Sequence, residues 1–227
     1  MIFDKCDWLV NPYDSINFNN LPHGIIINGP RGVGKKLLAK KISEKIISNF
    51  QEKLNNDHQN LFDKNNHPDF YLLDKDKYLL KDIRRQKKDS KNWAEEKGFN
   101  DVVAFLTLTP SISKNKVVCM INADTMNNIA QNALLKSLEE PAPYSYIIMT
   151  TSRSKALNQT IYSRCQVINI PFISSSKIND WLQDNGINDF SSIDFPSLAT
   201  PFSILDDIQS DRQNCYKEFI SILVDFI

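Results

Sequence analysis

Several features that would assign a chain to a special class of protein are missing from this sequence. Its 227 residues carry 27 basic and 27 acidic side chains, so no overall field indicates a nucleic-acid partner. The four cysteines form no Cys-x-x-Cys pair, which indicates neither a zinc site nor a disulfide framework. No apolar run approaches the roughly 18 residues of a membrane span. Asp4, Lys5 and Asp7 interrupt the apolar start, so no signal peptide is expected. We therefore expect a cytoplasmic protein with reduced thiols and no membrane partner.

Charge is unevenly distributed along the chain, although the totals cancel. Residues 31–45 contain six basic side chains and one acid, Glu44, whereas residues 179–227 contain nine acids and two bases. Solvated helix faces explain both segments. The alternative for the basic segment is contact with the backbone of duplex DNA through Lys40, Lys41 and Lys45.

The most informative stretch runs from Gly24 to Lys36 and predicts a buried strand, a glycine-rich loop and a helix. Residues 29–36 fit the phosphate-binding pattern G-x-x-x-x-G-K-[ST] at seven of eight positions. The candidate nucleotide-binding residues are Gly29, Gly32, Gly34, Lys35 and Lys36. Backbone N–H groups at a helix start favour anions, so the loop is suited to cradling phosphate. The eighth position, where Ser or Thr would hold Mg²⁺, is Lys36.

Apolar runs alternate with helical repeats over the first three quarters of the chain, which predicts a parallel α/β sheet. We expect strands at residues 25–27, 70–73, 117–121, 146–150 and 167–170, and helices at 35–50, 127–140 and within 154–164. Residues 101–108 fit a helix or a strand, and a helix is favoured because parallel strands need a crossover. Residues 51–66 predict a loop or short helix, and residues 75–100 an exposed and partly helical segment. Residues 1–23 form a lead-in without strong periodicity.

The pattern changes after Pro171, where only helical segments follow. We expect domain boundaries at 1–171, 172–212 and 213–227: an α/β domain, a small helical lid and a further helix. Ile178, Trp181 and Leu182 anchor the first lid helix. A unit this small buries little core by itself, so the lid should lean on the first domain or on a partner.

Three further segments carry a family resemblance. They are His67-Pro68-Asp69, residues 130–141 (AQNALLKSLEEP) and residues 160–166 (TIYSRCQ). Together with the phosphate loop they resemble the AAA+ subunits of the bacterial clamp loader, gamma/tau and delta-prime of DNA polymerase III. The resemblance covers residues 21–171. It implies a P-loop AAA+ module, with a five-stranded parallel sheet flanked by helices and a small all-helical lid.

The resemblance also implies roles for single residues. Arg164, with Ser163 beside it, looks like an arginine finger that reaches the γ-phosphate of ATP held by a neighbouring subunit. An ordinary surface arginine in an ion pair is the alternative. Thr150 lies where the family keeps a polar sensor, although a plain strand-end threonine fits equally well. Glu139 and Glu140 resemble the end of a structural helix and not an acid–base pair.

Departures from the family pattern favour a resemblance to the non-hydrolysing delta-prime subunits over the hydrolysing gamma/tau subunits. Hydrolysing relatives have Asp-Glu after the third strand, where this chain has Asn122 and Ala123, with Asp124 one or two positions late. With Lys36 this makes two losses in one metal site, so we expect no metal and no ATP hydrolysis. ATP or ADP, if held, would stay intact. The four-cysteine module that the family usually carries is absent from residues 51–66, so zinc is not expected.

The resemblance implies a subunit that works within a complex. Its expected partners are gamma/tau-type ATPase subunits and the delta subunit, and through the complex the sliding clamp and primer-template DNA. Three alternatives remain open at this point: an active gamma/tau-like ATPase, a P-loop nucleotide kinase, and a scaffold in which loop and finger are both vestigial.

Overall fold

The computed structural model describes residues 3–50, 54, 56–84, 101–196, 199–212 and 216. A five-stranded sheet of order β2-β3-β4-β1-β5 forms its centre, and every pairing is parallel. The strands are β1 (Gly24–Asn28), β2 (Phe70–Asp74), β3 (Lys116–Ile121), β4 (Ser145–Thr151) and β5 (Cys165–Asn169). The predicted fold class is confirmed, because apolar runs covered on both faces form the inner strands.

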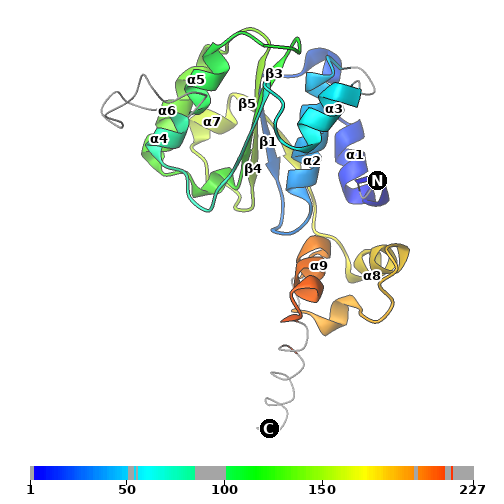
Figure 1. Ribbon diagram of the computed structural model, residues 1–227. Coiled ribbons are helices and arrows are strands. Elements are labelled where there is room, and N and C mark those ends of the chain that lie inside the picture. Colours follow the sequence, from blue (N-terminus) through cyan, green and yellow to red (C-terminus); the bar gives the residue numbers. More distant parts are fainter. Residues whose placement is uncertain are drawn as a thin grey trace.

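Helices cover both faces of the sheet (Figure 1). One face carries α1 (Asp7–Asp14), α2 (Lys35–Ile47) and α3 (Asn56–Asp63). The other carries α4 (Leu80–Ile83), α5 (Val102–Thr107), α6 (Asn128–Glu139) and α7 (Gln159–Tyr162). Short 3-10 turns lie at Phe3–Lys5, Phe18–Asn20, Ala123–Thr125 and Ser192–Asp194. Each face has its own buried apolar cluster, so the sheet separates two cores.

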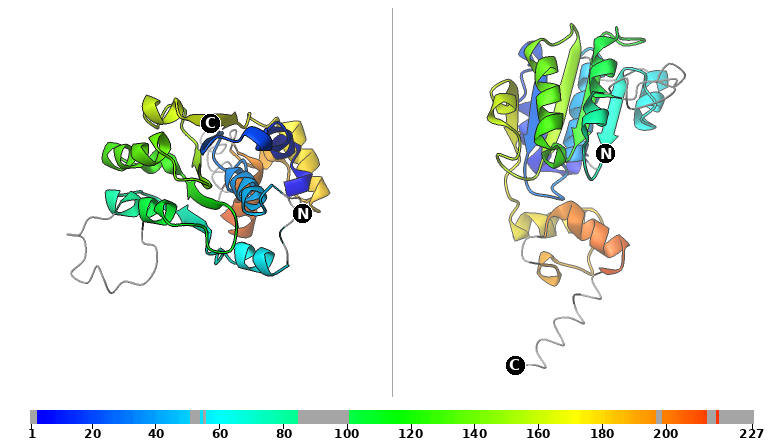
Figure 2. Two further views of the ribbon diagram at one scale, coloured as in Figure 1. Left: turned by 90° about the horizontal axis from the view of Figure 1, so that it is seen from above. Right: turned by 90° about the vertical axis from the view of Figure 1, so that its left-hand side faces the viewer.

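The α8 (Ser175–Asp184) and α9 (Pro201–Gln209) helices form a separate small layer below the sheet, as two views agree (Figures 1 and 2). Pro201 begins α9, because proline fits the first helical turn. Trp181 of α8 packs edge-to-face on Trp8 of α1, with ring centroids 5.7 Å apart. The lid therefore leans on the sheet layer through aromatic side chains. The proposed domain boundaries stay a prediction, and residues 213–227, apart from Tyr216, lie outside the described residues.

Two sequence expectations are wrong in part. The lead-in contains α1, whose Trp8 and Leu9 are buried, although residues 1–23 show no periodicity. The charged segment is not simply exposed, because Tyr78 and Ile83 are fully buried. The Tyr78 hydroxyl lies 2.7 Å from the Leu73 carbonyl oxygen and 2.6 Å from that of Ile121, at the carboxyl ends of β2 and β3. The remainder of that segment, residues 85–100, lies outside the described residues.

The His67-Pro68-Asp69 motif holds the loop at residues 111–113 in place through hydrogen bonds, and we call this arrangement the Asp69 clasp. Asp69 is fully buried, and its carboxylate accepts hydrogen bonds from the backbone N–H groups of three consecutive residues, Ser111, Ile112 and Ser113, at 2.5, 2.9 and 2.7 Å. His67 accepts from the Asp69 N–H through Nδ1. The motif thus fixes the loop that leads into β3, the strand that ends at the candidate site.

We predict that Asp69→Ala lowers the free energy of unfolding by about 2–4 kcal/mol, because three buried N–H groups lose a charged acceptor. Urea unfolding followed by tryptophan fluorescence measures the loss. Asp63→Ala, which removes an exposed carboxylate at the end of α3, is the control and should cost little. Equal losses in the two variants would contradict the clasp.

Candidate functional site

The phosphate loop lies between β1 and α2, at the carboxyl end of the sheet. Gly32 and Gly34 have φ angles of +72° and +97°, a left-handed backbone that side chains rarely permit. A Cβ atom on Gly34 would lie 2.7 Å from the Phe202 ring and 2.9 Å from Leu9. Glycine is required there for both its conformation and its size.

The lid rests directly on this loop. Thr200 donates a hydrogen bond from its hydroxyl to the Arg31 carbonyl at 2.8 Å, and the Phe202 N–H donates to the Gly32 carbonyl at 3.0 Å. On the other side, Trp8 donates from its indole N–H to the Val33 carbonyl at 3.0 Å. Parts of the chain that are distant in sequence therefore fix the shape of the loop, and no sequence pattern indicated these contacts.

A cavity of about 440 Å³ lies beside the loop. Arg31, Gly32, Gly34, Lys35, Lys36 and Lys40 line it from the loop and α2, Ile121, Asn122, Thr150 and Ser152 from the ends of β3 and β4, and Phe202 and Asp206 from α9. The structure thus brings together most of the predicted nucleotide-binding residues and Thr150. Gly29 does not line the cavity but supplies a carbonyl oxygen to Lys35.

Lys35 is the buried cation of the site, with 7% of its surface exposed. Its ammonium donates to the carbonyl oxygens of Gly29 and Pro30, at 2.8 and 2.5 Å. Burial lowers the pKa of Lys35 to about 8; the nearby Asp124 carboxylate opposes this shift and Arg31 adds to it. The loop can therefore present a positive charge at neutral pH, held in place by its own carbonyls.

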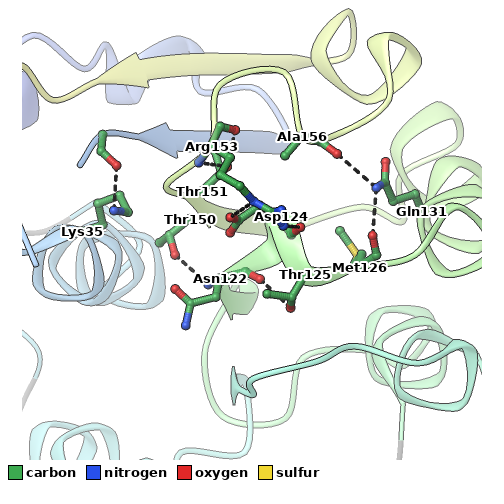
Figure 3. A network of polar contacts seen from close by, with 11 residues as sticks. Lys35, Asn122, Asp124, Thr125, Met126, Gln131, Thr150, Thr151, Arg153 and Ala156 are labelled. Carbon is green, nitrogen blue, oxygen red and sulfur yellow. Dashed lines mark hydrogen bonds and ion pairs between the residues drawn. The ribbon is translucent and has the colours of Figure 1, made fainter. Parts of the chain in front are cut away.

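The residues that could hold Mg²⁺ do not fit that ion. Lys36 places an ammonium at the metal-ligand position and pairs with Asp74 at 2.7 Å. The carboxylate of Asp124 is occupied by Arg153, whose Nε donates to Oδ2 at 3.0 Å (Figure 3). The other oxygen, Oδ1, is buried and accepts no hydrogen bond from the described residues. Asp124 is thus turned to a neighbouring loop and does not replace the missing Asp-Glu pair.

The Thr150 side chain has a structural contact as well as a place in the cavity. Its buried hydroxyl oxygen accepts from the Asn122 N–H at 3.0 Å (Figure 3). This bond joins the carboxyl ends of β3 and β4. A sensor role for Thr150 stays a prediction.

Arg164 lies between α7 and β5, far from this cavity in the fold. Its guanidinium donates to the Thr160 carbonyl at 3.0 Å and the Ser163 hydroxyl at 3.3 Å, and pairs with Glu139 of α6 at 2.9 Å. About a third of the side chain is exposed. This is the ion pair expected of an ordinary surface arginine. What distinguishes Arg164 is its place immediately before β5, at the amino end of the sheet.

Cys165, which follows, points inward beside Gly24, and burial raises the pKa of its thiol to about 12. It is a packing residue and not a reactive one. Among the described residues no three His, Cys, Asp or Glu side chains gather as a metal site would need. The described helices include none that is both long and apolar enough to cross a membrane.

We predict that Lys35→Met stabilises the protein at about pH 7 by roughly 1 kcal/mol, because a buried charge is removed. Between pH 8 and 10.5 the unfolded chain keeps a proton that the native Lys35 has lost, so native stability rises with pH in that window. The advantage of the variant should therefore shrink by about pH 10. Thermal unfolding at both pH values measures it, with Lys41→Met on the same helix as control. A pH-independent difference would contradict the lowered pKa.

Comparison with known proteins shows which family this chain resembles. The family model described as "DNA polymerase III, delta subunit" matches residues 11–174, which is more than half of the chain. The DNA polymerase III subunit delta' of Buchnera aphidicola subsp. Schizaphis graminum is 27% identical over 228 residues, covering 92% of this chain and 65% of the relative. That of Haemophilus influenzae is 28% identical over 207 residues, covering 87% and 59%.

Two other similar proteins carry gamma-type names. The DNA polymerase III subunit gamma/tau of Mycoplasma genitalium is 33% identical over 174 residues, covering 75% of this chain and 27% of the relative. A solved gamma subunit-related protein of Thermotoga maritima is 21% identical, with a TM-score of 0.49, and covers 80% of this chain and 50% of its own.

The chain spans less than two thirds of the length of the delta' relatives it matches. The match nevertheless includes the phosphate loop, the His67-Pro68-Asp69 clasp and Arg164. The chain therefore belongs to the delta-prime family of DNA polymerase III clamp-loader subunits.

Proposed function

We propose that this chain is a non-hydrolysing clamp-loader subunit that donates Arg164 to ATP bound by a neighbouring ATPase subunit. The observation that carries the proposal is the position of Arg164 relative to the chain's own phosphate loop. The loop follows the carboxyl end of β1, whereas Arg164 precedes the amino end of β5, the strand beside β1.

The register of β1 and β5 gives an estimate of the distance between Arg164 and the phosphate loop. Gly24 pairs with Cys165 and Asn28 pairs with Asn169, so the strands run in step over their whole length. At about 3.3 Å per residue the two ends lie roughly 15 Å apart. Arg164 also points to Glu139, away from the loop. If Arg164 serves a phosphoryl group, that group belongs to another molecule.

The local contacts of Arg164 suit such a role. Within the part of the chain that the structure describes, β5 pairs only with β1 and so forms an edge of the sheet, where a neighbour can approach. The backbone is fixed, because the Arg164 N–H donates to the carbonyl of the buried Ile161. Its ion pair with Glu139 is partly exposed, and such pairs contribute only about 0–1 kcal/mol. The guanidinium can therefore exchange Glu139 for a phosphate at little cost.

The residues of the chain's own cavity support the proposal that it does not hydrolyse ATP. Lys36, Asn122 and Ala123 replace the groups that would bind Mg²⁺ and polarise water, and Asp124 is engaged by Arg153. This argues against the alternative of an active gamma/tau-like ATPase. The family membership leaves a nucleotide kinase without support.

The wider role is proposed from the family. With gamma/tau-type subunits and the delta subunit, the chain would complete a complex that opens the sliding clamp and places it on primer-template DNA in the cytoplasm. DNA contact through Lys40, Lys41 and Lys45 gains little support, because Lys40 lines the cavity and Lys41 pairs with Glu44 at 3.2 Å.

We predict that Arg164→Ala lowers the clamp- and DNA-stimulated ATP turnover of the reconstituted complex by about 10³-fold at the site it serves. The physical reason is the loss of a fixed charge at the developing phosphoryl transition state. Steady-state phosphate release measures the change, after assembly of the complex has been verified by gel filtration. Arg164→Lys should not restore turnover, because an ammonium lacks the planar fork of the guanidinium.

Glu139→Gln is the matched control on the same ion pair. It removes the partner of Arg164 in the free chain but leaves the guanidinium in place, so turnover should stay within about threefold of wild type. Lys35→Ala in this chain should also have a small effect, because the turnover belongs to the neighbour. ATP turnover at the wild-type rate in the Arg164→Ala complex would refute the arginine-finger role of Arg164.

A further inference from the structure

One edge of the sheet, formed by β5, has open backbone groups. The Ile170 N–H donates to the Asn28 carbonyl at 2.7 Å and so faces β1. Backbone groups of successive residues point to opposite sides of a strand, so those of Val167 and Asn169 point away from β1. Within the described parts of the chain, the backbone N–H and carbonyl of these two residues take part in no hydrogen bond. We call this stretch, residues 165–169, the β5 edge.

The opposite edge of the sheet, at β2, is protected in three ways. The outward Phe70 N–H donates to the His67 carbonyl at 3.0 Å. The Phe62 ring of α3 packs against Phe70, with ring centroids 4.5 Å apart. Asp74 ends the strand with a charge and pairs with Lys36. Proteins protect sheet edges with such features because an open edge pairs readily with another chain.

The β5 edge lacks these three features among the residues that the structure describes. Residues 165–176 contain no charged side chain. Val167 is 38% exposed, and Phe172, just beyond the strand, is 76% exposed. An open edge with apolar side chains beside it is suited to a strand of another chain, whose backbone satisfies the open groups. Pro171 has no N–H to offer, so the added strand pairs over a short length only.

The position of Arg164 indicates which molecule supplies the added strand. Arg164 directly precedes the β5 edge, at the amino end of the sheet. A molecule whose nucleotide contacts Arg164 therefore lies against the start of this edge. An extended segment without charged residues fits there, because its alternate side chains lie beside Val167 and Phe172.

We propose that the ATPase subunit served by Arg164 adds an extended, uncharged segment to β5, so that the sheet continues from this chain into its neighbour. The open N–H and carbonyl groups of Val167 and Asn169 pair with the backbone of that segment. This inference rests on the proposed function of Arg164 and names a second contact of the same interface.

Hydrogen–deuterium exchange resolved to single amides tests the pairing directly. The whole chain is measured alone and assembled with gamma/tau-type and delta subunits and ATP. The amides of Gln166 and Ile168 face β1 and should exchange slowly in both states. The amides of Val167 and Asn169 should exchange fast in the free chain and at least about tenfold more slowly in the complex.

Two variants of Val167 test the edge by affinity. Val167→Pro removes an outward N–H and no bond to β1, as proline is tolerated on the open side of an edge strand. Val167→Lys keeps the N–H and adds a charge to the edge. Each should weaken binding to the gamma/tau-type subunit by about tenfold, measured by fluorescence anisotropy of the labelled chain.

Two matched controls accompany these variants. Val167→Thr keeps the side-chain shape and the N–H, and Gln183→Lys adds the same charge at an exposed position of α8. Both should bind like the wild type. Circular dichroism of every variant verifies that the fold is retained.

Three outcomes would overturn the proposal. The first is exchange of the Val167 and Asn169 amides that is equally fast in the free and the assembled chain. The second is wild-type affinity of both Val167→Pro and Val167→Lys. The third is protection of the two amides in the free chain that rises with its concentration, because a second copy would then cover the edge. The arginine-finger role is tested separately, by the turnover of the assembled Arg164→Ala complex, so the two proposals can fail independently.

Discussion

In a parallel sheet every strand starts at one end and finishes at the other, and β1 and β5 lie side by side under this constraint. The loop after β1 and the arginine before β5 therefore lie at opposite ends of the same pair of strands. Arg164 is therefore separated from the cavity beside this chain's own phosphate loop by the length of the two strands. If Arg164 serves a nucleotide, as we propose, this constraint means that the nucleotide is held by a neighbouring molecule.

The cavity depends on a second set of contacts, which join the lid to the loop. Phe202 packs on Trp181, with ring centroids 5.4 Å apart, and Trp181 packs on Trp8. These ring contacts hold α9 against the phosphate loop. There the Thr200 hydroxyl and the Phe202 N–H donate hydrogen bonds to loop carbonyl oxygens. The loop thus keeps the shape of a phosphate cradle although its metal ligands are gone.

Much of the fold could be predicted from the sequence because apolar runs and turn residues act locally. The five strands, α2, α6 and α8 follow from periodicity, and the sequence already showed Asn122 and Ala123 after β3 in place of an Asp-Glu pair. Contacts between distant segments could not be predicted in this way. The Asp69 clasp, the Trp8 bond to the loop and the Lys36–Asp74 pair join residues 25–44 positions apart. The α1 helix, with 8 residues, is too short for its apolar residues to give a clear repeat. Glu139 was interpreted as part of a structural helix, and its ion pair with Arg164 emerged only from the structure.

The central claim is that Arg164 faces a nucleotide held by another subunit. A photo-crosslinking amino acid placed at position 164 tests this most directly, in the assembled complex with gamma/tau-type and delta subunits and ATP. Mass spectrometry of the irradiated complex identifies the peptide that position 164 touches. The account predicts a crosslink to the phosphate-binding region of a neighbouring ATPase subunit. Crosslinks confined to this chain's own residues would contradict it.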